Sequence, residues 1–252
     1  MLDSVRRPSR KRVVVIFDAV GTLIRPVPDV IDVYHRAGRA FGSRLSVEEV
    51  KTRFHRARQK HFLVDVDTDQ RYDSELFSSD PMERELWRRL VQDMFPGVVE
   101  SAALLDHLWD HFKRPENWQV YDDVPSCWAK LRREGCRIGI GSNFDSRLLE
   151  VCAHFAPINT ADWVFCSAAI GFRKPDLGFY RRVQNAILGS ASGAESPGFW
   201  MVGDNWKNDV VAASDFGWES SWLVRRGAAD ERSISSLSQL PSLLRENRPR
   251  RC

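Results

Sequence analysis

Residues 12–25, Arg-Val-Val-Val-Ile-Phe-Asp-Ala-Val-Gly-Thr-Leu-Ile-Arg, decide the fold of this chain. They begin with a wholly apolar run, Val13 to Phe17, whose β-branched side chains are typical of a central parallel strand buried on both faces. The run ends at Asp18, and Gly21 permits a turn directly afterwards. A carboxylate in this place lies where open α/β sheets bind their ligands, although an Asp that only caps a loop would give the same local pattern.

The rest of the chain divides into a helical part and an alternating part. Between residues 26 and 116 apolar residues recur at helical spacing, which predicts helices at 29–41, 46–62, 80–94 and 101–112 with a polar connection at 65–80. In the third helix the expected buried stripe consists of Met82, Leu86, Leu90 and Met94. From residue 117 onward we expect strands at 136–141, 163–167, 199–202 and 220–224, separated by helices at 123–133, 146–155, 175–188 and 209–216.

Repeated β-then-α units imply a parallel sheet with helices on both faces. The sequence therefore predicts an α/β fold with a doubly wound, Rossmann-like parallel sheet. Residues 1–25 and 117–252 would form this core, and residues 26–116 would form an all-helical domain inserted after the first strand.

Composition limits the functional classes. Of 252 residues, 43% are hydrophobic and 28% charged, as in ordinary globular proteins, and the net charge is only +3. Nine basic residues lie near the two ends, so the body between them is acidic and we expect no nucleic-acid partner. No apolar run is long enough for a membrane span or a signal-peptide core, so we expect no membrane partner and a cytoplasmic location. The five cysteines form no C-x-x-C pair, which favours reduced thiols.

Four polar residues follow predicted strands. Asp18, Ser142, Lys174 and Asp204 each lie just past one of them. Because the carboxyl ends of parallel strands meet at one edge of the sheet, these side chains can form a single pocket. Taken singly, each has an ordinary interpretation as a turn residue, a helix cap or a surface lysine.

Taken in order, these residues resemble the four motifs of the haloacid dehalogenase-like (HAD) hydrolase superfamily. The order is Asp18 with Thr22, then Ser142, then Lys174, then Gly203-Asp204-x-x-x-Asn208-Asp209. The inserted helices stand where this family places its helical cap. A finer resemblance, to one branch of the family, rests on residues 117–120, 141–147, 174–176 and 202–205.

The resemblance implies a Mg²⁺-dependent phosphohydrolase in which Asp18 is the nucleophile and forms an aspartyl-phosphate. A divalent cation would separate the carboxylate from the phosphate, and Mg²⁺ prefers oxygen ligands. Asp18, Asp204 and the backbone carbonyl of Val20 would hold it. Asp209 would support the metal through its waters or orient Lys174.

The resemblance also implies a set of residues that hold the substrate. Ser142 and Thr22 would bind phosphate oxygens, and Lys174 would neutralise charge in the transition state. Asn143 would contact the substrate. The substrate would be a small phosphorylated or halogenated molecule, and the sequence leaves the oligomeric state open. The helical cap would hinge near residues 25–26 and 115–117.

Val20 is the one departure from the family pattern. It stands where the family's phosphatases carry a second Asp that acts as general acid and base, and Val can do neither. Three interpretations follow. The first is a phosphohydrolase with reduced activity or a narrower range of leaving groups. The second is a metal-independent hydrolase of carbon–halogen bonds, since a leaving halide needs no proton. The third is a catalytically silent binding protein with this fold.

Overall fold

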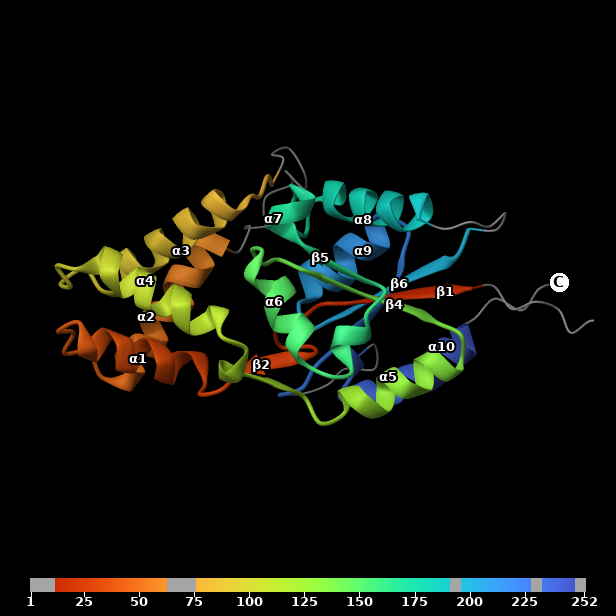
Figure 1. Ribbon diagram of the computed structural model, residues 1–252, viewed down its shortest axis with the longest axis horizontal. Helices are drawn as coiled ribbons and strands as arrows, with labels where there is room; N and C mark the ends of the chain where they lie inside the picture. The colour runs from red at the N-terminus through yellow and green to blue at the C-terminus, as the bar shows by residue number, and fades with distance from the viewer. Residues whose placement is uncertain (1–11, 63–75, 191–195, 228–232, 248–252) are drawn as a thin grey trace, which may run out of the picture.

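The computed structural model describes residues 12–62, 76–190, 196–227 and 233–247, and the statements below refer to these residues. Two parts are visible, a bundle of helices and an α/β core (Figure 1). The predicted polar connection at 65–80 lies partly outside the described residues, as do the basic residues of both termini apart from Arg12 and Arg245.

Six parallel strands form the sheet of the core. Their order is β5 (Trp163–Cys166), β4 (Arg137–Ser142), β1 (Val13–Phe17), β6 (Gly198–Gly203), β7 (Glu219–Leu223) and β8 (Ser233–Ile234). Phe17 at the end of β1 pairs with Ile140 on one side and with Val202 on the other. This register brings the carboxyl ends of β1, β4 and β6 into one row, from which Asp18, Ser142 and Asp204 follow.

The side chains of β1 alternate between two buried layers because successive residues of a strand point to opposite faces. Val15 and Phe17 pack with helices α5 (Val124–Arg133), α6 (Arg147–His154) and α10 (Leu240–Asn247). Val14 and Ile16 pack with α8 (Leu177–Gly189) and α9 (Ala212–Asp215). Figure 1 shows α5 and α10 on the opposite side of the sheet from α8 and α9. The predicted α/β fold with helices on both faces is confirmed.

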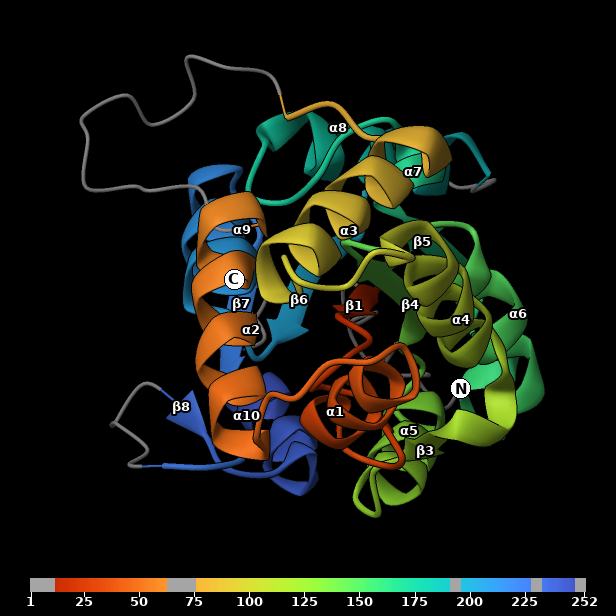
Figure 2. The same ribbon diagram turned by 90° about the vertical axis from the view of Figure 1, so that its left-hand side faces the viewer.

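The inserted part, which we call the insert, consists of α1 (Val30–Ala40), α2 (Val47–Phe62), α3 (Asp80–Met94) and α4 (Ser101–Lys113). These helices bury a core of their own, separate from the two core layers of the sheet. Figure 2 shows these helices in front of the α/β core. One expectation for α3 is wrong. Met82 is 45% exposed, and Glu83 is buried in its place with 2% exposure. The reason is an ion pair of Glu83 with the core, described below.

Several short elements were not predicted. Strands β2 (Ile24–Pro26) and β3 (Trp118–Val120) form an antiparallel pair at the junction of insert and core. Three residues are too few to show a strand period. A π-helix, residues 206–211, precedes α9 where one continuous helix was expected. The remaining unpredicted elements are 3-10 turns at 115–117, 158–160 and 237–239, helix α7 (Ser167–Ile170), strand β8 and helix α10. None of the helices in the described ranges is long and apolar enough to cross a bilayer.

Candidate active site

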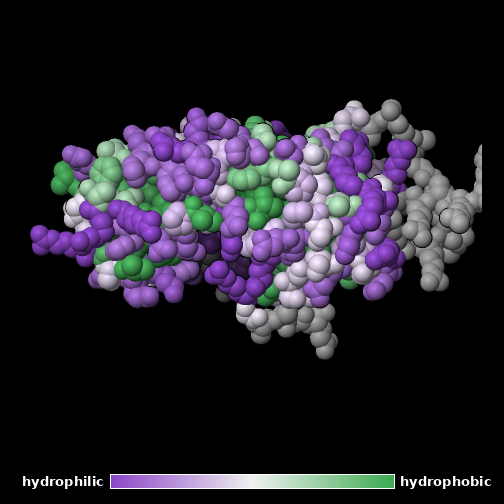
Figure 3. Space-filling view, turned by 60° about the horizontal axis from the view of Figure 1, so that its bottom comes forward, coloured by the Kyte–Doolittle hydropathy of each residue, from purple (hydrophilic) through white to green (hydrophobic). Residues whose placement is uncertain are grey.

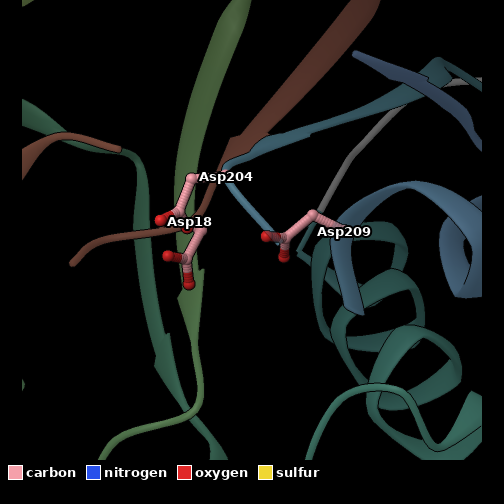
Figure 4. Close-up of side chains that lie close together, drawn as sticks. All are labelled: Asp18, Asp204 and Asp209. Atoms are coloured by element: carbon pink, nitrogen blue, oxygen red, sulfur yellow. The ribbon is translucent and has the colours of Figure 1, made fainter. Parts of the chain in front are cut away.

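Three carboxylates meet at the carboxyl edge of the sheet. Asp18 follows β1, Asp204 follows β6, and Asp209 comes from the π-helix after β6 (Figure 4). Each offers an oxygen such that the three oxygens lie within 4.8 Å of one another. Residues separated by almost two hundred positions in the sequence thus form one acidic cluster, as expected for strands that end in one row.

Lys174 lies inside this cluster. Its Nζ donates to Oδ1 of Asp18 at 2.9 Å, to Oδ1 of Asp209 at 2.6 Å and to the carbonyl of Gly141 at 2.9 Å. With 3% exposure it is not a surface lysine. Burial alone would lower the pKa of Lys174, but the carboxylates of Asp18 and Asp209 raise it above its usual range. The lysine is therefore a fixed cation between two acids.

Crowding of the acids raises their own pKa values. Burial, followed by the charge of Asp18, raises the pKa of Asp204 to about 7. Burial also raises the pKa of Asp209 to about 6, against the opposing effect of Lys174. One lysine does not compensate three carboxylates, so the cluster favours a further cation. Asp204 is exposed to solvent, whereas Asp18 and Asp209 are buried. The space-filling view shows a hydrophilic hollow between insert and core (Figure 3).

Two glycines permit the close approach of these acids. Gly21 has φ +87°, and a Cβ there would lie 2.2 Å from Oδ2 of Asp204. A Cβ at Gly203 would lie 2.1 Å from Oδ2 of Asp209. Any larger residue at either position would displace a carboxylate of the cluster. These contacts explain why glycine stands directly beside the acids in both loops.

Arg225 holds the loop that follows Asp18. It lies just past β7, and its guanidinium donates to the carbonyls of Gly21 at 3.1 Å and Thr22 at 2.7 Å. It also donates twice to Asp123, at 3.0 and 2.9 Å, and its guanidinium lies 3.8 Å from the ring centroid of Tyr121. Asp123 in turn accepts hydrogen bonds from the Ser236 hydroxyl and the Leu237 amide, at 2.8 and 2.9 Å.

Val20 and Thr22 lie in the loop that Arg225 holds. The Val20 carbonyl accepts no hydrogen bond from the described residues, so it is available to a ligand. Thr22 is fully buried, and its hydroxyl has no partner among the described residues. The loop therefore exposes no surface of Thr22 to a bound phosphate, and its phosphate-binding role stays a prediction.

Ser142 and Asn143 lie at the end of β4. Ser142 is buried at the row of strand ends. The side-chain amide of Asn143 donates to the Lys174 carbonyl at 2.7 Å, and its oxygen accepts from the Lys174 amide at 2.7 Å. Both polar ends of this amide are engaged by the backbone, so Asn143 positions Lys174 in this arrangement. A direct contact of Asn143 with substrate stays a prediction.

Sequence reasoning missed Arg225 and its partner Asp123. Arg225 stands directly after the predicted strand 220–224, so the rule that identified the other strand-end residues would also have identified it. For Asp123 the sequence predicts only the start of a helix. Nothing in the sequence links it to a residue more than a hundred positions away.

Comparison with known proteins shows the family of this chain. The family model of haloacid dehalogenase-like hydrolases matches residues 13–217, and the chain belongs to this family of hydrolases. Among curated relatives, the haloacid dehalogenase-like hydrolase domain-containing protein 3 of Danio rerio is 26% identical over 247 residues, which cover 92% of this chain and 96% of that protein. The human protein of the same name is 28% identical over 169 residues, 64% of this chain and 65% of its own. The finer resemblance to one branch is thereby confirmed.

Solved structures share the fold. The L-2-haloacid dehalogenase of Xanthobacter autotrophicus with chloropropionic acid covalently bound superposes with a TM-score of 0.61 at 19% identity, covering 94% of this chain and 99% of that one. A HAD phosphatase from Thermococcus onnurineus gives a TM-score of 0.58 at 22% identity, with 94% and 99% coverage. At these identities the likeness shows the fold, which hosts both kinds of hydrolase.

Proposed function

We propose that this chain is a Mg²⁺-dependent phosphohydrolase that acts on small phosphorylated molecules through an aspartyl-phosphate at Asp18. The observation that carries the proposal is the acidic cluster with Lys174 buried inside it. A carboxylate nucleophile held by a cation at the open edge of a sheet suits attack on an anionic substrate.

The residues present fit a magnesium ion. Asp18 and Asp204 offer carboxylate oxygens, and the Val20 carbonyl is unused by the described residues. A cation there would favour the charged form of Asp204, whose pKa burial and the charge of Asp18 raise to about 7. Oxygen ligands of this kind are those that Mg²⁺ prefers. When bound, the ion would screen the repulsion between Asp18 and a phosphate.

Asp209 is better suited to orient Lys174 than to bind the ion directly. One of its oxygens accepts from Lys174, and the other accepts from the Asn205 amide at 3.0 Å. In the proposed reaction an oxygen of Asp18 attacks phosphorus and the bond to the leaving oxygen breaks. Lys174 and Ser142 stabilise the charge on the phosphoryl oxygens, and water then hydrolyses the aspartyl-phosphate.

Val20 restricts this chemistry. No carboxylic acid stands two residues after Asp18 to protonate the leaving oxygen, so leaving groups that depart as stable anions are favoured. Acyl phosphates and phosphates of acidic phenols are of this kind. The same feature would also suit a haloacid dehalogenase, whose leaving halide needs no proton. An acidic cluster that repels a haloacid carboxylate argues against that alternative.

The test is a screen of the purified protein against acetyl phosphate, nitrophenyl phosphate, sugar phosphates and 2-haloacids, with and without Mg²⁺. We expect Mg²⁺-dependent release of phosphate, fastest from the first two substrates. Halide release that is unaffected by a chelator would replace the proposal with the dehalogenase. Absence of turnover on every substrate would favour a binding protein.

A further inference from the structure

The insert contacts the core beyond the two chain connections at β2 and β3. Arg147 of α6 contacts Trp109 of α4, and a second contact lies beside Lys174. Residues 76–78 run beside residues 171–173. The Arg173 amide donates to the Leu76 carbonyl at 2.8 Å, and the Ser78 amide donates to the Gly171 carbonyl at 3.0 Å. These hydrogen bonds end one residue before Lys174, so the insert holds the backbone that carries the buried lysine.

A buried ion pair lies next to this contact. Glu83 of α3 is 2% exposed, and Nη1 of Arg173 lies 2.8 Å from each of its carboxylate oxygens. The Ser78 hydroxyl donates to Glu83 at 2.6 Å, and the Ser167 hydroxyl of the core lies 3.2 Å from the same oxygen. Breaking such a pair would leave an uncompensated buried charge. The pair therefore fixes the insert against residue 173.

The same contact region reaches the segment that carries Ser142. The Ser167 hydroxyl lies 3.1 Å from both the amide nitrogen and the carbonyl oxygen of Phe144. Asp80, the first residue of α3, accepts from the Ser146 amide at 2.8 Å and from its hydroxyl at 2.6 Å. One end of α3 thus holds residues 142–147 as well as residues 171–174.

From this geometry we infer that Glu83 and Arg173 are positioning residues that couple docking of the insert to the placement of Lys174 and Ser142. Phosphate is then bound well only when the insert is docked. The inference rests on the proposed function, since it names the residues that ready the site for phosphate. The proposed Mg²⁺ ligands have no such dependence on the insert, because core residues hold them: Arg225 holds the loop after Asp18, and Trp222 donates to the Asp204 carbonyl.

Opening of the insert requires more than bending at the two chain connections. The sequence predicted a hinge at residues 25–26 and 115–117, where few contacts break. In the structure, opening at that hinge must also separate Glu83 from Arg173 and Asp80 from Ser146. By linkage, a phosphate that favours the docked state must stabilise docking by the same factor.

The test compares Glu83→Gln with Glu85→Gln. Both variants make the same chemical change on α3, but Glu85 is 40% exposed and pairs only with Arg88 and Arg89 of its own helix among the described residues. Glutamine at position 83 keeps the shape and removes the charge that holds Arg173. The Glu85 variant controls for loss of a carboxylate on this helix.

Three measurements are made on the full chain. Calorimetric titrations give the affinity for Mg²⁺ alone and for inorganic phosphate in the presence of Mg²⁺. Hydrogen exchange follows the amides of Lys174, Arg173 and Ser78. We expect Glu83→Gln to bind phosphate about tenfold more weakly, within the usual range of coupling between sites. Its Mg²⁺ affinity should match the control, and its Lys174 amide should exchange faster. In the parent, phosphate should slow exchange of the Ser78 amide.

A second variant, Arg173→Lys, tests the inference in case Glu83→Gln does not fold. Arg173→Lys keeps the charge but replaces the planar guanidinium, whose Nη1 reaches both Glu83 oxygens, with an ammonium group. Its phosphate affinity should fall between those of the parent and Glu83→Gln. Equal phosphate affinity and equal Lys174 exchange in Glu83→Gln and Glu85→Gln would overturn the inference. An equal loss of phosphate and Mg²⁺ binding would also overturn it. If the parent binds no phosphate, the proposed function fails, and the exchange of Lys174 still decides whether Glu83 positions this residue.

Discussion

The two halves of the site are built by different parts of the chain. The proposed metal half comprises Asp18, the Val20 carbonyl and Asp204, and it lies within the core. Arg225 and Asp123 hold the loop after Asp18, and the Trp222 indole donates to the Asp204 carbonyl. The proposed phosphate half comprises Ser142 and Lys174, which lie on two segments that the insert contacts through Glu83 and Asp80. Both halves meet in the hydrogen bond from Lys174 to Asp18.

The difference shows how an inserted domain can govern a reaction without supplying a reacting group. Core residues fix the carboxylates, whereas docking of the insert fixes the groups that neutralise phosphate. In the proposed function, such a core can bind its cation before the insert docks.

Asp18 belongs to the metal half and also accepts from Lys174 of the phosphate half, so its loss should have the largest effect. In Asp18→Asn the nucleophile is gone and Lys174 loses one of its two carboxylate partners. We expect phosphate release to fall by a factor on the order of 10⁴ or more, as for other nucleophile replacements. Steady-state assays on nitrophenyl phosphate measure it. Substantial remaining turnover would mean that Asp18 is not the attacking group.

Val20→Asp should restore a proton donor to the metal half. General acids contribute about 10²- to 10⁴-fold, so an incompletely placed one should raise alkyl phosphate hydrolysis by about tenfold or more. Nitrophenyl phosphate should gain less, because its leaving group departs without a proton. The ratio of the two rates in parent and variant is the measurement. A parent that cleaves both classes at similar rates would show that another group supplies the proton.

Arg225→Gln should weaken the metal half alone. It removes the charged donors to the Gly21 and Thr22 carbonyls, and loss of such outer contacts costs about 10- to 100-fold in metal affinity. The exposed neighbour in Arg226→Gln is the matched control. Calorimetric titration should show weaker Mg²⁺ binding in Arg225→Gln than in Arg226→Gln, whereas hydrogen exchange of the Lys174 amide should be the same in both. Faster exchange of this amide in Arg225→Gln would show that the two halves are not held independently.

Acidic pH should weaken Mg²⁺ binding because the metal half must lose a proton first. With the pKa of Asp204 near 7, affinity should rise by about tenfold between pH 6 and pH 8. The metal-free folded protein holds protons that the unfolded chain has released, so its stability should fall as pH rises from about 4 to about 7. Melting curves at several pH values, with and without Mg²⁺, test both statements. Asp204→Asn should flatten the pH dependence.

The acidic cluster was predictable from sequence because β1 and β6 are continuous apolar runs that end abruptly at a polar residue. Asp18 and Asp204 follow from that rule alone. Glu83 was not predictable, because a glutamate inside an amphipathic helix has the same pattern whether it faces water or a buried arginine. The place of Asn143 after a strand predicts a contact with substrate, but the sequence does not show its hydrogen bonds to the Lys174 backbone. The domain limits, the magnesium ion and the cytoplasmic location stay predictions.

The network around Asp123 sets a limit on shortening the chain. The family match ends at residue 217, yet Arg225, Ser236 and Leu237 lie beyond it and brace the loop that follows Asp18. A fragment cut at residue 217 would contain every motif of the family and lack the support of its first one. It would also lack β7, β8 and α10, so we expect it to lose metal affinity, and the sequence match covers less of the chain than the folded site uses.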